Sequence, residues 1–337
     1  MVTIKDIAKQ AEVSTTTVSR VLNDYPDVNS ETREKVLKII KENNYRPSTV
    51  ARSLSTNKSR TIGIFFIDHY ISGLQHPFFR EVIYGLGKKL GENGYDIVYF
   101  TNQHWGDSFS YLEKCKDRHV DGVVLMGVQA SDPHLVKLLR SNLPTVFVDI
   151  DITGKNATYV ISDNISGAKK AVHYLYKLGH RKIGTILGID STKACQQRFN
   201  GYKIALEELG LPYKSEWVYE GNYSEEDSYQ AIKNMFDEKN LPTAIFCQSD
   251  NMAIGAMRAI EEAGYKVPDD FSLIGFDNIE PGRYIRPALT TIAQKKEELG
   301  CSAAKLLLNM INKTDQCNSP IILPVELIER ETCRKIE

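Results

Sequence analysis

The sequence predicts an α/β protein that carries a small helical domain at its N-terminus. The first sixty residues show short segments of helical periodicity that end near Pro47, because the residue before a proline is disfavoured in a helix. From Thr61 onward, apolar runs of strand length alternate with helical stretches. Buried apolar strands that alternate with helices are typical of parallel sheets covered on both faces. The number of strands predicts two doubly wound parallel-sheet subdomains instead of one sheet.

Length and charge agree with this division. A chain of 337 residues is long enough for two or three cores. Residues 1–60 carry eleven Lys and Arg against seven Asp and Glu, a net charge of +4, whereas the remainder carries 31 against 36, a net charge of −5. A basic head on an acidic body fits a DNA-binding head better than a uniform enzyme.

The cysteines and the apolar runs exclude other classes of protein. The six cysteines (115, 195, 247, 301, 317 and 333) form no Cys-x-x-Cys pair and have no His partner at metal-ligand spacing. We therefore expect reduced thiols, no metal and no cofactor. No apolar run reaches membrane-spanning length, and the N-terminus resembles a capped helix more than a signal peptide. The sequence predicts a cytoplasmic protein that does not bind a membrane.

The N-terminal domain contains two short helices about a tight turn. Thr3–Ala11 has the periodicity of one helix, and Thr3 followed by Asp6 makes a capped start. After a brief turn, Ser14 can cap a second helix over residues 15–22. Two short helices in this arrangement indicate a helix-turn-helix, whose second helix lies in the DNA major groove.

A third helix completes the head. We expect it from Ser30, as its cap, to about Asn43, with apolar contacts to the first two helices from Val36, Leu37, Ile40 and Tyr45. Residues 48–55 could form one or two further turns, but no periodic apolar face ties them to a core. A helix that short is marginal alone and needs a partner to form.

The sequence of the body, residues 61–337, predicts seven strands and seven helices. We expect strands at Ile62–Ile67, Ile97–Phe100, Val120–Met126, Thr145–Asp149, Lys182–Leu187, Ala244–Cys247 and Leu273–Phe276. Helices are expected near Phe79–Glu92, Leu112–Arg118, Pro133–Ser141, Ser166–Leu178, Arg198–Leu209, Ser224–Asp237 and Met252–Ala263. Ligands of such sheets bind beyond the carboxyl ends of the strands, so the residues that follow the strands are the candidates for binding.

A series of motifs in order identifies a family. The motifs are Thr3-Ile4-Lys5-Asp6-Ile7-Ala8, Val13-Ser14 through Asn23, Tyr45-Arg46-Pro47, Val50-Ala51-Arg52-Ser53-Leu54, His76-Pro77-Phe78-Phe79, Asp250-Asn251-Met252-Ala253-Ile254-Gly255 and Gly275-Phe276-Asp277. Together they resemble the LacI/GalR family of bacterial transcription factors over nearly the whole chain. The resemblance implies a helix-turn-helix domain over residues 1–46, a hinge helix and linker over 47–60, and an effector-binding and dimerisation domain over 61–337. That last domain is expected to be periplasmic-binding-protein-like, with two interleaved α/β subdomains.

The resemblance also implies which residues contact DNA. In the second helix they are Thr15, Thr16, Ser19 and Arg20. Threonine hydroxyls can bond several bases, and an arginine can grip guanine with two hydrogen bonds. The alternative for Arg20 is a solvated charge. This helix is similar to that of purine-controlled family members, which have His where this chain has Arg20.

For residues 50–55 the resemblance implies a hinge helix that forms only on the operator, in the minor groove. Leu54 would then be pushed between base pairs, and Ala51 and Arg52 would lie beside it. The alternative is an ordinary linker that contains an incidental leucine.

In the body, the resemblance implies nine effector contacts: His76, Phe78, Phe79, Asp149, Arg198, Tyr223, Ser249, Asp277 and Gln294. Aromatic rings can stack on the apolar face of a sugar or a base. Carboxylates accept hydroxyl protons, and a buried arginine suits vicinal hydroxyls or a carboxylate. Phe78 and Phe79 could instead belong to the core, and Asp149 and Asp277 could instead cap loops.

Enzyme motifs are missing from the sequence. It contains no P-loop, nucleophile elbow or His-Glu-x-x-His motif, and Gly85-Leu86-Gly87 lies inside an amphipathic helix. We therefore predict a homodimeric repressor that binds a near-palindromic operator in double-stranded DNA and is controlled by a small molecule, most simply a sugar. Two alternatives stay open: control by a purine corepressor, and control by a phosphorylated partner protein, as in the catabolite control relatives.

Overall fold

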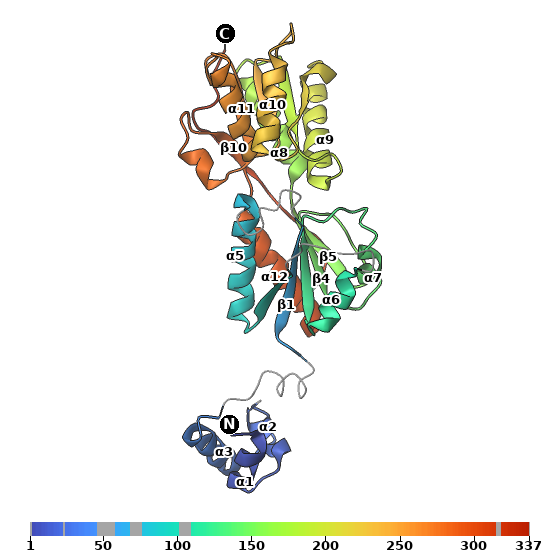
Figure 1. The fold of residues 1–337 in the computed structure, drawn as a ribbon, viewed down its shortest axis with the longest axis vertical. Coiled ribbons are helices and arrows are strands. Elements are labelled where there is room, and N and C mark those ends of the chain that lie inside the picture. The colour runs from blue at the N-terminus through green and yellow to red at the C-terminus, as the bar shows by residue number, and fades with distance from the viewer. Residues whose placement is uncertain are drawn as a thin grey trace. The chain divides into compact units, whose positions relative to one another are not determined.

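The computed structural model describes residues 2–22, 24–45, 58–67, 76–100, 109–314 and 318–336 (Figure 1). The chain forms two compact units. Residues 1–61 and 119–121 make up the first, and residues 62–118 and 122–337 make up the second. The expected hinge helix, with Ala51, Arg52 and Leu54, lies outside the described residues.

Among its described residues, the first unit has three helices: α1 (Ile4–Ala11), α2 (Thr15–Leu22) and α3 (Ser30–Glu42). The predicted helix starts are confirmed for the first two. Thr3 and Asp6 form a capping box on α1, and the Ser14 hydroxyl accepts from the Thr17 amide at 3.0 Å. The core between the helices consists of Ile7, Ala8, Ala11, Val18, Val21 and Val36.

Two predictions for α3 are wrong. Asn29 is the cap, because its side chain accepts from the Thr32 amide at 2.7 Å, and Ser30 is the first helical residue. Leu37 is 46% exposed and does not contribute to the core. Val36 and Ile40 face the other helices because they are four residues apart on one side of α3, and Leu37 is rotated by about 100° from Val36.

Two six-stranded sheets organise the second unit, and the predicted fold class is confirmed. The first sheet has the order β11-β5-β4-β3-β1-β2, with β1 (Thr61–Phe66), β2 (Asp96–Phe100), β3 (Gly122–Met126), β4 (Thr145–Val148), β5 (Ala157–Ser162) and β11 (Ile321–Leu323). The second has the order β12-β10-β9-β8-β6-β7, with β6 (Ile183–Leu187), β7 (Val218–Glu220), β8 (Ala244–Cys247), β9 (Ser272–Asp277), β10 (Thr290–Ala293) and β12 (Glu326–Ile328). Parallel pairing links β1, β3, β4, β5 and β11, and β10 and β12 pair antiparallel at the edge of the second sheet.

Helices cover both sheets, and each sheet with its helices forms one of two lobes (Figure 1). The first lobe carries α5 (Pro77–Glu92), α6 (Tyr111–Asp117), α7 (Leu135–Leu139) and α12 (Lys296–Asn312). The second lobe carries α8 (Asn164–Lys177), α9 (Lys193–Glu208), α10 (Glu225–Met235) and α11 (Asp250–Glu262), with the short 3-10 helices η2 (Ser215–Trp217) and η3 (Glu280–Arg283). Each lobe therefore has helices packed on its own sheet, as the alternating pattern predicted.

The chain crosses between the lobes three times. It leaves the first lobe after β5, returns after β10 into α12, and crosses again between β11 and β12. The crossing segments are Asp163, residues 294–295 and residues 324–325. Each lobe is therefore built from segments that are not continuous in sequence.

Five strands and one helix were not predicted: β5, β7, β10, β11, β12 and α12. Two of them show why. β10 begins with Thr290 and Thr291, which are polar in sequence but fully buried, because hydrogen bonds engage both hydroxyls. The α12 helix has no side-chain hydrogen bond at its N-cap, so the usual start signal is missing.

The close contact between α5 and α12 gives a stability test. A Cβ added at Gly85 would lie 2.1 Å from the Glu297 carbonyl oxygen, whereas one added at Gly91 in the same helix meets nothing within 4 Å. We expect Gly85→Ala to lower the free energy of unfolding by about 1–3 kcal/mol, because the two helices must separate. Gly91→Ala should raise it by up to about 1 kcal/mol, because alanine favours helix. Urea unfolding followed by circular dichroism measures both, and equal effects would contradict the close-packing argument.

Candidate functional site

The exposed face of α2 gathers the residues expected to read DNA. Thr15, Thr16 and Arg20 are exposed and Ser19 is partly buried, whereas Val18 and Val21 on the other face are buried. This separation follows from helical spacing, since 15, 16, 19 and 20 lie on one side. Hydroxyl and guanidinium groups on an exposed helix can bond to base edges.

Arg20 forms an ion pair with Asp27 of the head. Its Nη1 atom lies 2.8 Å from Asp27 Oδ2, and the two side chains are 52% and 49% exposed. An ion pair this exposed contributes little to stability. Arg20 can therefore exchange Asp27 for another acceptor at small cost.

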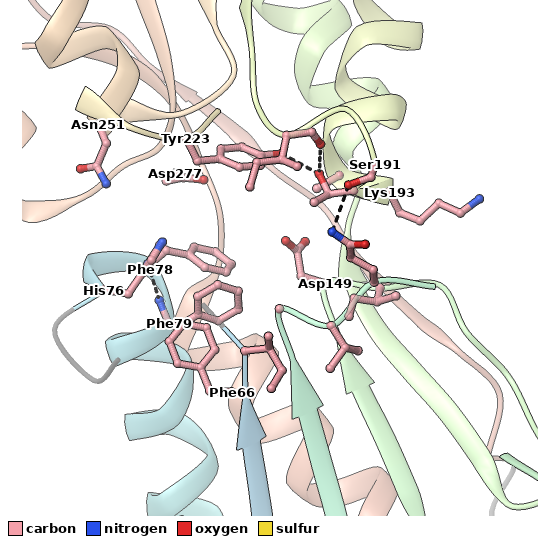
Figure 2. Close-up of a pocket in the computed structure, with 18 of the residues that line it drawn as sticks. Phe66, His76, Phe78, Phe79, Asp149, Ser191, Lys193, Tyr223, Asn251 and Asp277 are labelled. Atoms are coloured by element: carbon pink, nitrogen blue, oxygen red, sulfur yellow. Dashed lines mark hydrogen bonds between the residues drawn. The ribbon is translucent and has the colours of Figure 1, made fainter. Parts of the chain in front are cut away.

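A cavity of about 330 Å³ lies between the two lobes of the second unit (Figure 2). Its lining includes residues that follow strands of both sheets. Ile67 follows β1, Asp149 follows β4, and Gln294 follows β10. The carboxyl ends of the strands thus face the same space, which is where open α/β sheets bind ligands.

Eight of the nine predicted effector contacts line this cavity: His76, Phe78, Phe79, Asp149, Arg198, Tyr223, Asp277 and Gln294. The ninth, Ser249, does not line it. Its hydroxyl accepts from the Met252 amide at 3.3 Å and caps α11. A residue directly before a helix commonly uses its hydroxyl in this way, so the effector role of Ser249 stays a prediction that the cavity lining does not support.

Aromatic rings from the first lobe form one wall of the cavity. The Phe79 ring lies 4.6 Å from that of Phe66 and 5.0 Å from that of His76, measured between centroids. Phe78 is only 4% exposed and belongs to the core of the lobe, although it also lines the cavity. His76 also serves as the N-cap of α5 through Nδ1, which lies 3.5 Å from the Phe79 amide.

Tyr223 forms the opposite wall (Figure 2). Its backbone has a φ of 63°, and its hydroxyl lies 3.4 Å from the Thr192 hydroxyl. A Cβ on Gly188 would lie 2.1 Å from the Tyr223 ring, so the ring position requires glycine there. Burial raises the pKa of Tyr223, so the phenol stays protonated and can donate.

Asp149 points into the space between these walls (Figure 2). Its Oδ1 atom is buried and has no hydrogen-bond partner among the described residues. Burial raises the pKa of Asp149 to about 6, the nearby Arg198 charge opposes this rise, and Asp277 adds to it. A buried acceptor without a partner costs free energy, which a donor from a ligand would recover.

Arg198 is a buried cation beside the cavity. It is 3% exposed, and its Nε donates to Asn164 Oδ1 at 2.9 Å. Its Nη1 donates to the Gln248 carbonyl at 2.6 Å and lies 3.7 Å from Asp277 Oδ1. The guanidinium also lies 3.8 Å above the Phe276 ring. These contacts fix the orientation of the guanidinium.

Asp277 and Gln294 complete the polar centre. Gln294 Nε2 donates to Asp277 Oδ1 at 2.6 Å, and Gln294 Oε1 is buried without a hydrogen bond to any part of the chain that the structure describes. Burial raises the pKa of Asp277, and Arg198 opposes this rise. The centre therefore offers two unsatisfied acceptors, on Asp149 and Gln294, near one buried cation.

Several lining residues were missed from the sequence: Gln129, Ser191, Lys193, Glu225 and Asn251. Gln129 follows β3 and Ser191 follows β6, so the strand-end rule could have found both. Gln129 Nε2 donates to Ser191 Oγ at 3.2 Å, which joins the two lobes beside the cavity (Figure 2). Lys193 extends away from the cavity in this view.

The cavity has the chemistry of a binding site. Aromatic faces, carboxylates and a fixed guanidinium suit a ligand that carries several hydroxyl or N–H groups. Within the described parts of the chain, no group of three His, Cys, Asp or Glu side chains is placed to hold a metal ion. None of the described helices is long and apolar enough to cross a membrane.

Sequence comparison identifies the family. The profile for bacterial regulatory proteins of the lacI family matches residues 3–48, and that for a periplasmic binding protein-like domain matches residues 172–333. The HTH-type transcriptional repressor PurR of Mannheimia succiniciproducens is 38% identical over 339 residues, which cover 100% of each chain. The chain belongs to the LacI family. As a member, it is a DNA-binding transcriptional regulator and not an enzyme.

Solved LacI-family structures have the same fold. The lac repressor dimer bound to operator and the anti-inducer ONPF is 30% identical, with a TM-score of 0.82 over 99% of both chains. The complex of the transcriptional regulator CelR with cellobiose is 28% identical, with a TM-score of 0.73 over 98% of this chain and 100% of that one.

The α2 face generates a prediction for DNA binding. Arg20→Ala should weaken binding to a selected palindromic duplex at least tenfold, because loss of a bidentate contact to guanine costs about 1–3 kcal/mol. Lys38→Ala removes the same charge from an exposed position on α3 and should change the affinity little. Fluorescence anisotropy with specific and scrambled duplexes measures both. If Arg20→Ala weakens binding to both duplexes equally, Arg20 does not read bases.

The raised pKa of Asp149 generates a prediction for stability. A carboxyl with a pKa of about 6 in the folded protein and an ordinary value of 3.8 stabilises the fold below pH 4, and this contribution is lost as the pH rises through 6. Asp149→Asn should therefore be more stable than the parent at neutral pH, by about 3 kcal/mol, and the difference should close in acid. Urea unfolding across this range measures it. The exposed Asp190→Asn is the control, and a pH-independent difference for Asp149→Asn would contradict the burial effect.

Proposed function

We propose that the protein is a dimeric repressor that binds a near-palindromic operator and is released or recruited by a small sugar or sugar derivative in the cavity. Residues 1–46 would bind DNA, residues 47–60 would form the hinge, and residues 61–337 would bind effector and dimerise. The protein would act in the cytoplasm, where its operator lies.

One observation carries the effector proposal: the unpaired Asp149 Oδ1 beside Arg198, between two aromatic walls. Sugar hydroxyls donate to carboxylates, and the apolar face of a pyranose stacks on aromatic rings. The CelR structure contains cellobiose, which supports a sugar in a cavity of the same fold. Asp149, Arg198, Asp277 and Gln294 would bond the hydroxyls, and Phe79 and Tyr223 would flank the ring.

The DNA-binding proposal combines the head with the hinge. Thr15, Thr16, Ser19 and Arg20 would read the major groove from α2. Ala51, Arg52 and Leu54 would bind the minor groove. The lac repressor dimer bound to operator supports both the DNA target and the dimer. Two half-sites about one helical turn apart are then expected, with a deformable step between them.

The mechanism couples the cavity to DNA through the angle between the lobes. A ligand that contacts both lobes favours one angle over others, because only differential contacts shift an equilibrium. Paired hinge segments would then be brought together or moved apart. A small change in their separation alters operator affinity, since both hinges must order on DNA.

A purine corepressor is the second candidate. The PurR relative and the similarity of α2 to purine-controlled members favour it. A purine would also supply N–H donors to Asp149 and Gln294. The third candidate, a phosphorylated partner protein, would act on the surface of the body and leave the cavity unused.

One experiment separates these candidates. Full-length protein is selected against random oligonucleotides, and its melting temperature is measured with D-glucose, D-ribose, cellobiose, D-glucuronate, guanine and hypoxanthine. We expect a palindrome and a thermal shift with at least one sugar. Failure to select any DNA would refute the repressor. A shift with guanine or hypoxanthine alone would establish the purine candidate, and no shift with any of the six would favour the protein partner.

Asp277 provides the prediction for the cavity. Asp277→Asn should weaken binding of the sugar found in that panel at least tenfold, because an amide nitrogen would replace one carboxylate oxygen beside Arg198. Glu280→Gln removes a charge three residues later, on a side chain that is 62% exposed and does not line the cavity. Isothermal titration measures both variants. Equal affinities for Asp277→Asn and the parent would remove Asp277 from the site.

A further inference from the structure

The Asp121 carboxylate accepts hydrogen bonds from the end of the segment that links the head to the body. Its Oδ1 accepts from the Ser59 amide at 2.8 Å and from the Ser59 hydroxyl at 3.0 Å, and its Oδ2 accepts from the Arg60 amide at 2.9 Å. Its own amide donates to the Thr61 carbonyl at 2.9 Å. Two of the three bonds to the carboxylate come from backbone, so they fix the path of the chain and not only a side chain.

These hydrogen bonds lie at the amino end of two paired strands. Thr61 begins β1, and Asp121 directly precedes β3. The two strands pair in parallel from Ile62 with Gly122 to Phe66 with Met126. A position fixed at residues 59–60 is therefore fixed to the β1–β3 pair by neighbouring residues on both strands.

The opposite end of the same strand pair lines the cavity. Phe66 ends β1 and Ile67 follows it, and Gly127 follows β3. The two chains stay tightly packed there, because the Ile67 amide donates to the Met126 carbonyl at 3.0 Å and a Cβ on Gly127 would lie 2.0 Å from the Ile67 carbonyl oxygen. Five residues of strand, about 17 Å, separate the two ends.

The cavity end of the pair also touches the second lobe. Gln129, three residues after β3, donates to Ser191 of that lobe at 3.2 Å. A change in the angle between the lobes therefore acts on the segment that continues β3. Paired strands transmit such a displacement because the extended covalent backbone resists stretching along the strand and the hydrogen bonds between the strands resist sliding.

We propose that Asp121 is a positioning residue that fastens the base of the hinge to the β1–β3 pair, so that movement at the cavity reaches the DNA-binding head. This inference rests on the proposed function. The carboxylate is required because both of its oxygens accept, and Ser59 and Arg60 present donors to both. In Asn, an NH2 group would face one of these donors.

The test uses full-length protein and four chains: the parent, Asp121→Asn, Ser59→Ala and Asp117→Asn. Asp117 is the matched control, because it is an exposed aspartate four residues before Asp121. Hydrogen exchange of peptides that cover residues 58–62 measures how firmly Asp121 holds residues 59–60. Anisotropy with the selected palindrome, with and without each of the six compounds of the panel, measures operator affinity and its response. Thermal shifts with the same compounds report the cavity.

Asp121→Asn should speed exchange at Ser59 and Arg60 about tenfold, weaken operator binding about tenfold and bring the affinity ratio with and without ligand toward one. Its thermal shifts should equal those of the parent. Ser59→Ala keeps both backbone bonds and should have a smaller effect, and Asp117→Asn should have none.

Unchanged exchange in Asp121→Asn would show that the Asp121 carboxylate does not hold residues 59–60. Faster exchange with the operator affinity and ligand response of the parent would show that this contact does not couple the cavity to DNA binding. Loss of the thermal shift in Asp121→Asn would mean that the substitution acts on the cavity itself, which also overturns the proposal. If the parent binds no palindrome, the proposed function fails. A parent that binds and responds, beside an Asp121→Asn variant that does the same, refutes only the role of Asp121.

Discussion

The buried guanidinium of Arg198 is the interaction around which the cavity is organised. It approaches Asp277, lowers the pKa of Asp149 against the effect of burial, and is itself fixed by Asn164 and the Gln248 carbonyl. Without a buried cation, two buried carboxylates in one space would repel each other and take up protons. Because Arg198 belongs to α9 and Asp149 to the first lobe, this one charge also acts across the gap between the lobes.

The sequence predicted those strands whose buried residues are apolar. Apolar runs such as Ala244–Cys247 gave their strands directly. It did not predict strands whose buried residues are polar and form hydrogen bonds with distant parts of the chain. The β10 strand buries Thr290, whose hydroxyl accepts from the Arg330 amide, forty residues away. Such a strand has no local apolar pattern, so only the assembled sheet explains it.

The predicted effector contacts came from the family resemblance, and eight of the nine line one cavity in the structure. The exception, Ser249, caps α11 with its hydroxyl, a role that its place directly before a helix also predicts. Gln129 and Ser191 show a limit of prediction from sequence. Each follows a strand, but their contact across the lobes depends on how two sheets face each other, which no spacing in the sequence encodes.

The three crossings have a consequence for synthesis on the ribosome. The first lobe receives α12 and β11 only after β6 to β10 of the second lobe have been translated, although α12 buries Leu299, Leu306 and Leu307 against the elements made first. Until residue 296 and those after it emerge, the apolar side of α5 and its sheet has no cover from this helix. A nascent chain that ends before residue 296 would thus leave the earliest-made lobe without α12 and β11, and the apolar surface that they cover would be prone to aggregation.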